Sequence, residues 1–185
     1  MIKKIWSVEP KDLMKKSLIF FKECITQFKK TGAVCPSSPS LQEKMLEQVD
    51  FSKPLHILEL GPGNGCITEK ILKKMHPDST LSCIEINPNF CAILEKIKTD
   101  KNFKVLNTSV YEADNFFAPK SIDWVISSLP LKNFSEKEID CCLDIIKTLL
   151  KKEGQFVQFQ YSKKFEQLLV SHFSDVKKDF VLFNI

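Results

Sequence analysis

Three glycines in alternation, placed between an apolar segment and an amphipathic one, constrain the fold of this chain more than any other feature. The segment HILEL (56–60) has the pattern of a buried strand, and Gly61, Gly63 and Gly65 follow it directly. Helical periodicity begins at once, over residues 65–75. Glycines allow a sharp turn and a close approach of backbone to ligand, and a helix start offers free N–H groups. The pattern therefore predicts a strand–loop–helix unit that binds a small molecule at its loop.

Short apolar runs continue to alternate with helical patterns along the rest of the chain. Strands are expected at 56–60, 80–86, 103–107, 122–128, 155–161 and about 174–183, and helices at 65–75, 88–98, 135–151 and 163–172. Asn87-Pro88 and the capping-box spacing of Ser135 and Glu138 indicate helix starts. This alternation favours an α/β fold with a doubly wound, mostly parallel, Rossmann-like sheet.

The first fifty residues have a different pattern, so we expect an N-terminal helical extension over 1–50 and one domain over 51–185. Over residues 10–30, phenylalanines and leucines segregate from lysines, which predicts an amphipathic helix with a cationic polar face. Such a helix either packs on the core or lies on an anionic membrane surface. A second helix is expected at 41–49, started by a capping box at Ser40.

Two acidic residues define the ligand that the loop favours. Glu85 closes the second expected strand, twenty residues after Gly65, where an acid can hold a ribose through its hydroxyls. NAD is the competing ligand, but dinucleotide loops place a third glycine where this chain has Cys66. Glu59, directly before the loop, would repel a pyrophosphate. It suits S-adenosylmethionine (SAM), which carries an ammonium and a sulfonium.

The segment from Glu59 to Gly65, ELGPGNG, resembles the first motif of class I SAM-dependent methyltransferases, and Glu85 matches their ribose-binding acid. The resemblance implies SAM as the cofactor. It also implies a cofactor site formed by Ser38, Glu59, Gly61, Gly63, Gly65, Glu85, Ile86, Ser109, Val110 and Ser127. Ser109 stands where these enzymes often have an aspartate that holds the adenine amino group.

Three further segments resemble the bacterial phospholipid N-methyltransferases, which convert phosphatidylethanolamine to phosphatidylcholine: TGAVCPSSPSL (31–41), SSLPL (127–131) and VQFQY (157–161). A more distant resemblance is to the rRNA adenine dimethylases, which have an N-L-P-Y-type segment at the end of strand four. The nearer resemblance implies a phospholipid amine as substrate. The amine would be held by the catalytic residues Ser128, Leu129, Pro130 and Tyr161.

Composition bears on partners and location. The net charge of +4 comes from 27 lysines without a single arginine, which weighs against base-specific nucleic-acid readout. We therefore expect an anionic membrane surface, contacted through 10–30, as partner, with nucleic acid less favoured. The chain has no apolar run of membrane-spanning length and no signal-peptide pattern, so the expected location is cytoplasmic, peripheral on the inner face of a membrane. The seven cysteines lack metal-ligand spacing, which predicts buried free thiols and no metal site.

Alternatives to phospholipid methylation remain open at this stage. They are N-methylation of rRNA adenine, N-methylation of a small molecule, and SAM binding without catalysis. Ser109 and the early end of the chain at Ile185 point to the last of these. The family continues into a seventh strand, so the sheet is expected to lack its last strand.

Overall fold

A computed structural model describes residues 38–97, 102–159 and 166–177. The chain divides into two compact units, 1–33 and 34–185, and every described residue belongs to the second. The amphipathic helix expected at 10–30 and Tyr161 both lie outside the described residues. The following description concerns the second unit.

Helices and strands alternate as the sequence predicts. The strands are β1 (His56–Leu60), β2 (Thr80–Ile84), β3 (Phe103–Leu106), β4 (Ile122–Ser127) and β5 (Leu150–Gln158). The α-helices are α2 (Pro39–Leu46), α3 (Cys66–Lys74), α4 (Pro88–Ile97), α5 (Glu136–Leu149) and α6 (Glu166–His172), with 3-10 turns η1 (Val110–Asn115) and η2 (Leu131–Asn133). The strands form one parallel sheet in the order β3-β2-β1-β4-β5. From β1 the chain adds β2 and β3 on one side of the sheet and then β4 and β5 on the other. The fold is therefore Rossmann-like and doubly wound, as expected.

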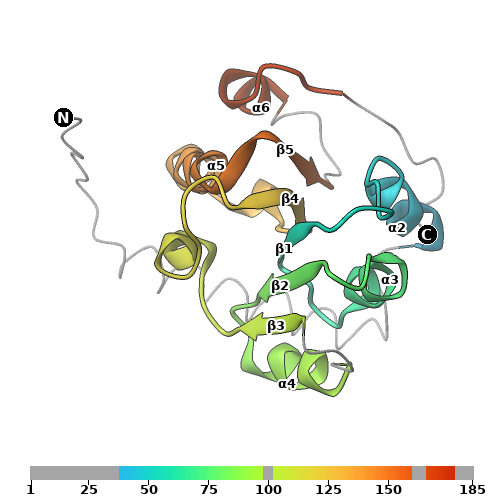
Figure 1. Cartoon of the computed structure of the whole chain (residues 1–185). Coiled ribbons are helices and arrows are strands. Elements are labelled where there is room, and N and C mark those ends of the chain that lie inside the picture. Colours follow the sequence, from blue (N-terminus) through green and yellow to red (C-terminus); the bar gives the residue numbers. More distant parts are fainter. Residues whose placement is uncertain (1–37, 98–101, 160–165, 178–185) are drawn as a thin grey trace. The chain divides into compact units, whose positions relative to one another are not determined.

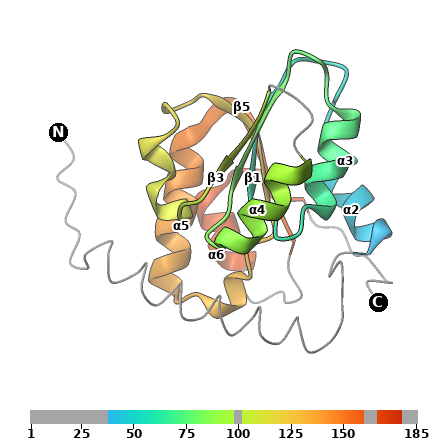
Figure 2. The ribbon, with the colours of Figure 1, turned by 90° about the horizontal axis from the view of Figure 1, so that it is seen from below.

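Each face of the sheet has its own apolar core, because successive strand residues point to opposite sides. Leu58 and Leu60 of β1 pack with α5 and η1, whereas Ile57 packs with α2, α3 and Leu94 of α4. Figures 1 and 2 show α5 and α6 on one side of the sheet and α2 and α3 on the other. Both faces are covered, so the ends of the strands are the edges left for a ligand.

Local signals set most of the helix boundaries. Asn87 caps α4 through the bond from Asn89 N–H to its Oδ1, 3.0 Å, and Ser135 with Glu138 forms the predicted capping box of α5. The start of α2 differs from the prediction. Ser38 caps it, with Pro39 in the first turn, so the expected capping box at Ser40 is wrong.

Strand β5 begins five residues earlier than the sequence predicts. Leu150 pairs with Ile122 directly after α5 ends, and the register then shifts before Gln155 pairs with Trp124. Gly154 lies in the irregular stretch, where a β-carbon would come 2.9 Å from the Ile122 carbonyl oxygen. Hydrophobic periodicity does not report a close approach between backbones, so it predicts the strand only from Gln155 onward. The sixth strand expected at about 174–183 is not present over the described residues 174–177.

Within the described residues, the cysteines follow the prediction with one exception. Cys83, Cys91, Cys141 and Cys142 are buried thiols outside any disulfide. Cys66, in the first turn of α3, is disulfide-bonded, so the prediction of a free thiol is wrong at this position.

Candidate functional site

The glycine loop lies at the carboxyl end of β1. Gly61, Gly63 and Gly65 all have positive φ angles, of 67°, 58° and 89°, which L side chains rarely adopt. A β-carbon at Gly65 would lie 2.6 Å from Ile97 Cδ1, and one at Gly61 would lie 3.0 Å from Leu129 Cδ2. At Gly63 nothing lies within 4 Å of that position. The first and last glycines therefore allow close packing within the protein, whereas the middle one borders open space.

Glu59 is a buried carboxylate on β1, just before the loop. Its Oε2 accepts from Thr68 Oγ1 of α3 at 2.7 Å and from Cys83 Sγ of β2 at 3.4 Å. Its Oε1 is buried and has no hydrogen-bond partner among the residues that the structure describes. Burial raises the pKa of Glu59 from its ordinary value of 4.5 to about 7, against the lowering effect of the Thr68 bond.

Glu85 follows the last residue of β2 and ties the loop to that strand. Its Oε2 accepts from Gly63 N–H at 3.1 Å and its Oε1 from Asn87 N–H at 2.8 Å. Desolvation raises the pKa of Glu85 to about 7, although these backbone donors oppose the shift. Ile86, the next residue, is half-buried. Asn87 uses Oδ1 to cap α4, and its buried Nδ2 has no acceptor within the described ranges.

The remaining predicted cofactor residues have structural contacts of their own. Ser109 caps η1 by accepting from Tyr111 N–H at 3.3 Å, and Val110 is buried in the core that contains α5. Ser38 caps α2 by accepting from Leu41 N–H at 3.3 Å. A cofactor contact by these three residues stays a prediction.

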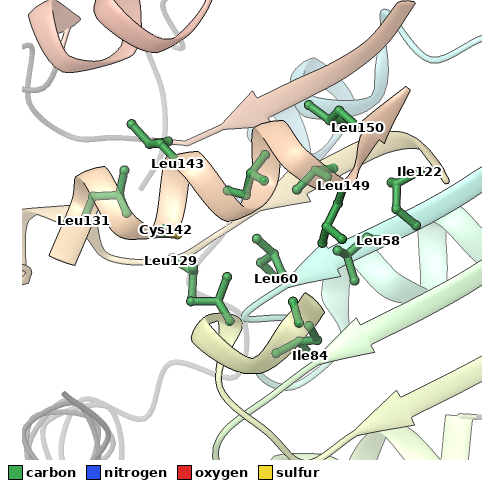
Figure 3. Packing of buried hydrophobic residues seen from close by; sticks show 14 of the residues in the cluster. Leu58, Leu60, Ile84, Ile122, Leu129, Leu131, Cys142, Leu143, Leu149 and Leu150 are labelled. Carbon is green, nitrogen blue, oxygen red and sulfur yellow. The ribbon is translucent and has the colours of Figure 1, made fainter. Parts of the chain in front are cut away.

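The SSLP segment forms a tight turn at the end of β4. Ser127 Oγ accepts from Leu129 N–H at 3.3 Å, and Ser128 N–H donates to the Leu60 carbonyl of β1 at 2.9 Å. Pro130, with φ −79° and ψ 72°, has the backbone of an inverse γ-turn, in which Leu131 N–H donates to the Leu129 carbonyl at 2.9 Å. Figure 3 shows the Leu129 side chain beside Leu60. Leu129 also lies next to Gly61, where a β-carbon would come 3.6 Å from the Leu129 backbone nitrogen, so the turn packs against the glycine loop.

Gln158, the last residue of β5, completes this edge. Its Nε2 donates to the Leu129 carbonyl at 3.1 Å and to the Phe159 carbonyl at 2.7 Å. Its Oε1 is buried and has no partner in the described part of the chain. The sequence analysis did not single out Gln158 or Asn87. Their one local signal is a polar residue at or just beyond the carboxyl end of an apolar strand.

Unpartnered polar atoms concentrate at this edge of the sheet. Within the described ranges, three buried side-chain atoms lack a hydrogen-bond partner: Glu59 Oε1, Asn87 Nδ2 and Gln158 Oε1. Each belongs to a residue at or just beyond the carboxyl end of a strand. Leaving such an atom unpaired costs about 1–3 kcal/mol, which a ligand with matching groups would recover. Two acceptors, one donor and the open space at Gly63 fit a cationic, hydroxyl-rich ligand such as SAM.

The fold and the matching family define a class I SAM-dependent methyltransferase, the class whose cofactor is SAM. A family model described as "Ribosomal RNA adenine dimethylase" matches residues 36–171. The chain belongs to this family. No curated protein matches the chain.

Solved structures share the fold at low sequence identity. One is a precorrin-6y C5,15-methyltransferase from Geobacter metallireducens: 18% identity, TM-score 0.58, covering 71% of this chain and 68% of that one. Another is a 1,6-didemethyltoxoflavin-N1-methyltransferase from Burkholderia thailandensis: 13% identity, TM-score 0.58, covering 85% and 66%. A SAM-dependent methyltransferase from Mesorhizobium loti has 17% identity and a TM-score of 0.53, covering 63% of this chain. The match covers 52% of that chain, so this protein spans about half of its length.

None of the helices in the described residues is long and apolar enough to span a bilayer.

Proposed function

We propose that this protein transfers a methyl group from SAM to an amino nitrogen. The observation that carries the proposal is the set of unpartnered buried atoms at the carboxyl edge of the sheet. Glu59 and Asn87 lie on the β1–β2 half of that edge, where the glycine loop is, and Gln158 lies on the β4–β5 half. A donor molecule and an acceptor molecule would thus bind side by side.

The residues around the edge would act by holding and aligning groups. When bound, SAM supplies an electrophilic methyl group on a sulfonium. Glu59 would place a carboxylate oxygen toward the cationic end of the cofactor, and Glu85 with Asn87 would hold the ribose. The SSLP turn would keep the amine in line with the methyl group and away from water. Alignment of this kind accounts for much of the rate of a displacement reaction.

Family membership supports an adenine amino group in RNA as one candidate acceptor. The matched model covers the glycine loop, the SSLP turn and β5. Adenine has an exocyclic amine, so the chemistry at the edge of the sheet is compatible with this acceptor.

The surroundings of SSLP support a phospholipid amine as the other candidate. Enzymes that act on a flipped-out base commonly stack it on an aromatic side chain. The position of the tyrosine in the N-L-P-Y-type segment is Leu131 here, and Leu131 is 1% exposed within the core. The next aromatic residue, Phe134, also packs against that core. A ring-free ethanolamine head group needs no stacking partner, so we propose it as the first acceptor to test. A peripheral position on the inner face of a membrane is part of this proposal.

A labelling experiment tests both acceptors together. The full chain would be incubated with methyl-labelled SAM and either phosphatidylethanolamine vesicles or an rRNA transcript, with Gly63→Val as the control that lacks a working loop. Label in lipid supports the head-group amine, and label in adenine supports the RNA acceptor. No label above the Gly63→Val control in either fraction would overturn the proposal.

A further inference from the structure

The Leu129 carbonyl is the obvious acceptor for a substrate amine, yet its bonding capacity is used within the protein. It accepts from Leu131 N–H at 2.9 Å and from Gln158 Nε2 at 3.1 Å. A carbonyl oxygen has two lone pairs, so two such bonds fill it. The backbone conformation of Pro130 holds the first bond, and the side chain of Gln158 makes the second. A substrate amine at this edge of the sheet therefore needs another acceptor.

The orientation of the Gln158 amide is set by its neighbours. The Leu129 and Phe159 carbonyls can only accept hydrogen bonds, so the NH2 group must face both of them. This arrangement directs Oε1 elsewhere, where it is buried and meets no donor among the described residues. Since the atom is shielded from solvent, bulk water does not satisfy it. A molecule that brought an N–H group to Oε1 would supply the missing bond.

We infer that Gln158 is the residue that positions the substrate amine, by accepting one of its N–H bonds at Oε1. The inference rests on the proposed function. The acceptor for the amine N–H is then the Gln158 side chain, and the bond from Gln158 Nε2 to the Leu129 carbonyl holds this side chain in place. Gln158 ends β5, next to the β4 turn, so its oxygen lies on the half of the edge assigned to the acceptor substrate.

The bond orients the nitrogen and takes no proton. The amine lone pair forms the new bond to the methyl carbon as the carbon–sulfur bond breaks, and the bonding electron pair goes to sulfur. The methylated ammonium loses one N–H proton to solvent after the product has left the site. The amide oxygen is too weak a base to take that proton, so Gln158 acts by direction alone.

Two substitutions separate this function from a structural one. Gln158→Leu removes the acceptor and both donated bonds. Gln158→Glu keeps an acceptor oxygen, and in its protonated form it donates to one of the two carbonyls. The matched control is Gln155→Leu, an exposed glutamine on the same strand. Acceptor kcat/KM would be measured on phosphatidylethanolamine vesicles and on an rRNA transcript, with SAM affinity by calorimetry and thermal unfolding alongside.

We expect Gln158→Leu to lower kcat/KM for the methylated acceptor about tenfold, the order of one lost hydrogen bond. SAM affinity should stay within about twofold. Gln158→Glu should recover most of the loss, and Gln155→Leu should behave as wild type. The inference is overturned if Gln158→Leu keeps full activity, if its SAM affinity falls in parallel, or if Gln158→Glu is equally impaired. A wild-type protein that methylates neither acceptor would overturn the proposed function itself.

Discussion

Gly61, Gly63 and Gly65 share a left-handed backbone, but their surroundings differ. A side chain at Gly65 would collide with Ile97 and Leu94 of α4, whereas one at Gly63 would project into open space. Only at Gly63 would an added methyl group occupy the volume that we assign to the cofactor. A substitution at Gly65 should therefore mainly lower stability, whereas one at Gly63 should mainly weaken ligand binding.

Gly63→Ala and Gly65→Ala form a matched pair for this prediction. Both substitutions carry the cost of about 1–2 kcal/mol for a left-handed non-glycine residue. Gly65→Ala should lower the thermal unfolding midpoint further, because Ile97 must also move. Gly63→Ala should weaken SAM binding more than its midpoint change explains. Calorimetry and thermal unfolding measure the two effects, and equal SAM affinity in both variants would contradict the assignment.

The buried carboxyl groups make stability depend on pH. The pKa values of Glu59 and Glu85 rise from 4.5 to about 7 on folding, because burial disfavours the charged form. A raised folded pKa means that their contribution to stability is full below pH 4.5 and declines until pH is about 7. Glu43 and Asp50 have pKa values lowered to about 2, so their opposite contributions change at lower pH.

We therefore expect the free energy of unfolding to fall between pH 4.5 and 7, and Glu59→Gln to flatten this decline. The amide cannot ionise, so one of the two titrating groups is removed. Urea unfolding of both proteins at pH 5 and pH 7.5 measures the difference. Parallel pH profiles would show that Glu59 is not protonated in the folded protein at pH 5.

At the scale of elements, α2 is held to α3 by two kinds of contact. Glu43 of α2 pairs with Lys70 and Lys74 of α3, each at 2.7 Å, at a site open to solvent. Leu46, also on α2, is 2% exposed and packs in the core on that face of the sheet. Exposed ion pairs contribute little because water screens them, whereas buried apolar contacts contribute strongly.

Leu46→Ala should lower the free energy of unfolding by about 2–4 kcal/mol, from lost burial and the cavity left behind. Glu43→Gln should leave the unfolding midpoint almost unchanged. Urea unfolding of the two variants beside wild type checks the order. A larger loss for Glu43→Gln would mean that the ion pairs dominate the attachment of α2.

At the scale of the whole molecule, we predict that residues 10–30 determine the kind of surface that the protein contacts. Residues 10–30 lie outside the described structure, and membrane contact through them stays a sequence prediction. The prediction depends on charge placement, so substitutions that change the total charge equally at two places can test it.

A triple lysine-to-glutamate variant at Lys15, Lys22 and Lys29 should lose binding to vesicles that contain anionic lipid. The control carries the same charge change at exposed lysines of the domain: Lys73, Lys104 and Lys152. Wild type and control should sediment with anionic vesicles, less so at high salt, because salt screens the attraction. Equal losses in both variants would show that only net charge matters.

Local patterns in the sequence determined the elements of this protein and their order. Hydrophobic period distinguishes strand from helix, and capping residues such as Ser135 mark helix starts, because both effects act within a few residues. The glycine loop, Glu59 and Glu85 were predicted for the same reason: each stands at a defined distance from its strand. The early start of β5 was missed, because it depends on the approach of Gly154 to β4.

Only the tertiary structure decided which polar atoms remain available. The Leu129 carbonyl is filled by Leu131 and by Gln158, and Gln158 is 29 residues further along the chain. Among the described residues, the packing of the strand ends leaves Asn87 Nδ2 and Gln158 Oε1 without partners. Sequence spacing shows which residues reach the edge of the sheet. The hydrogen-bond capacity of each residue, however, is shared among groups that only folding brings together. Which of their atoms face a ligand depends on the neighbours that folding brings beside them.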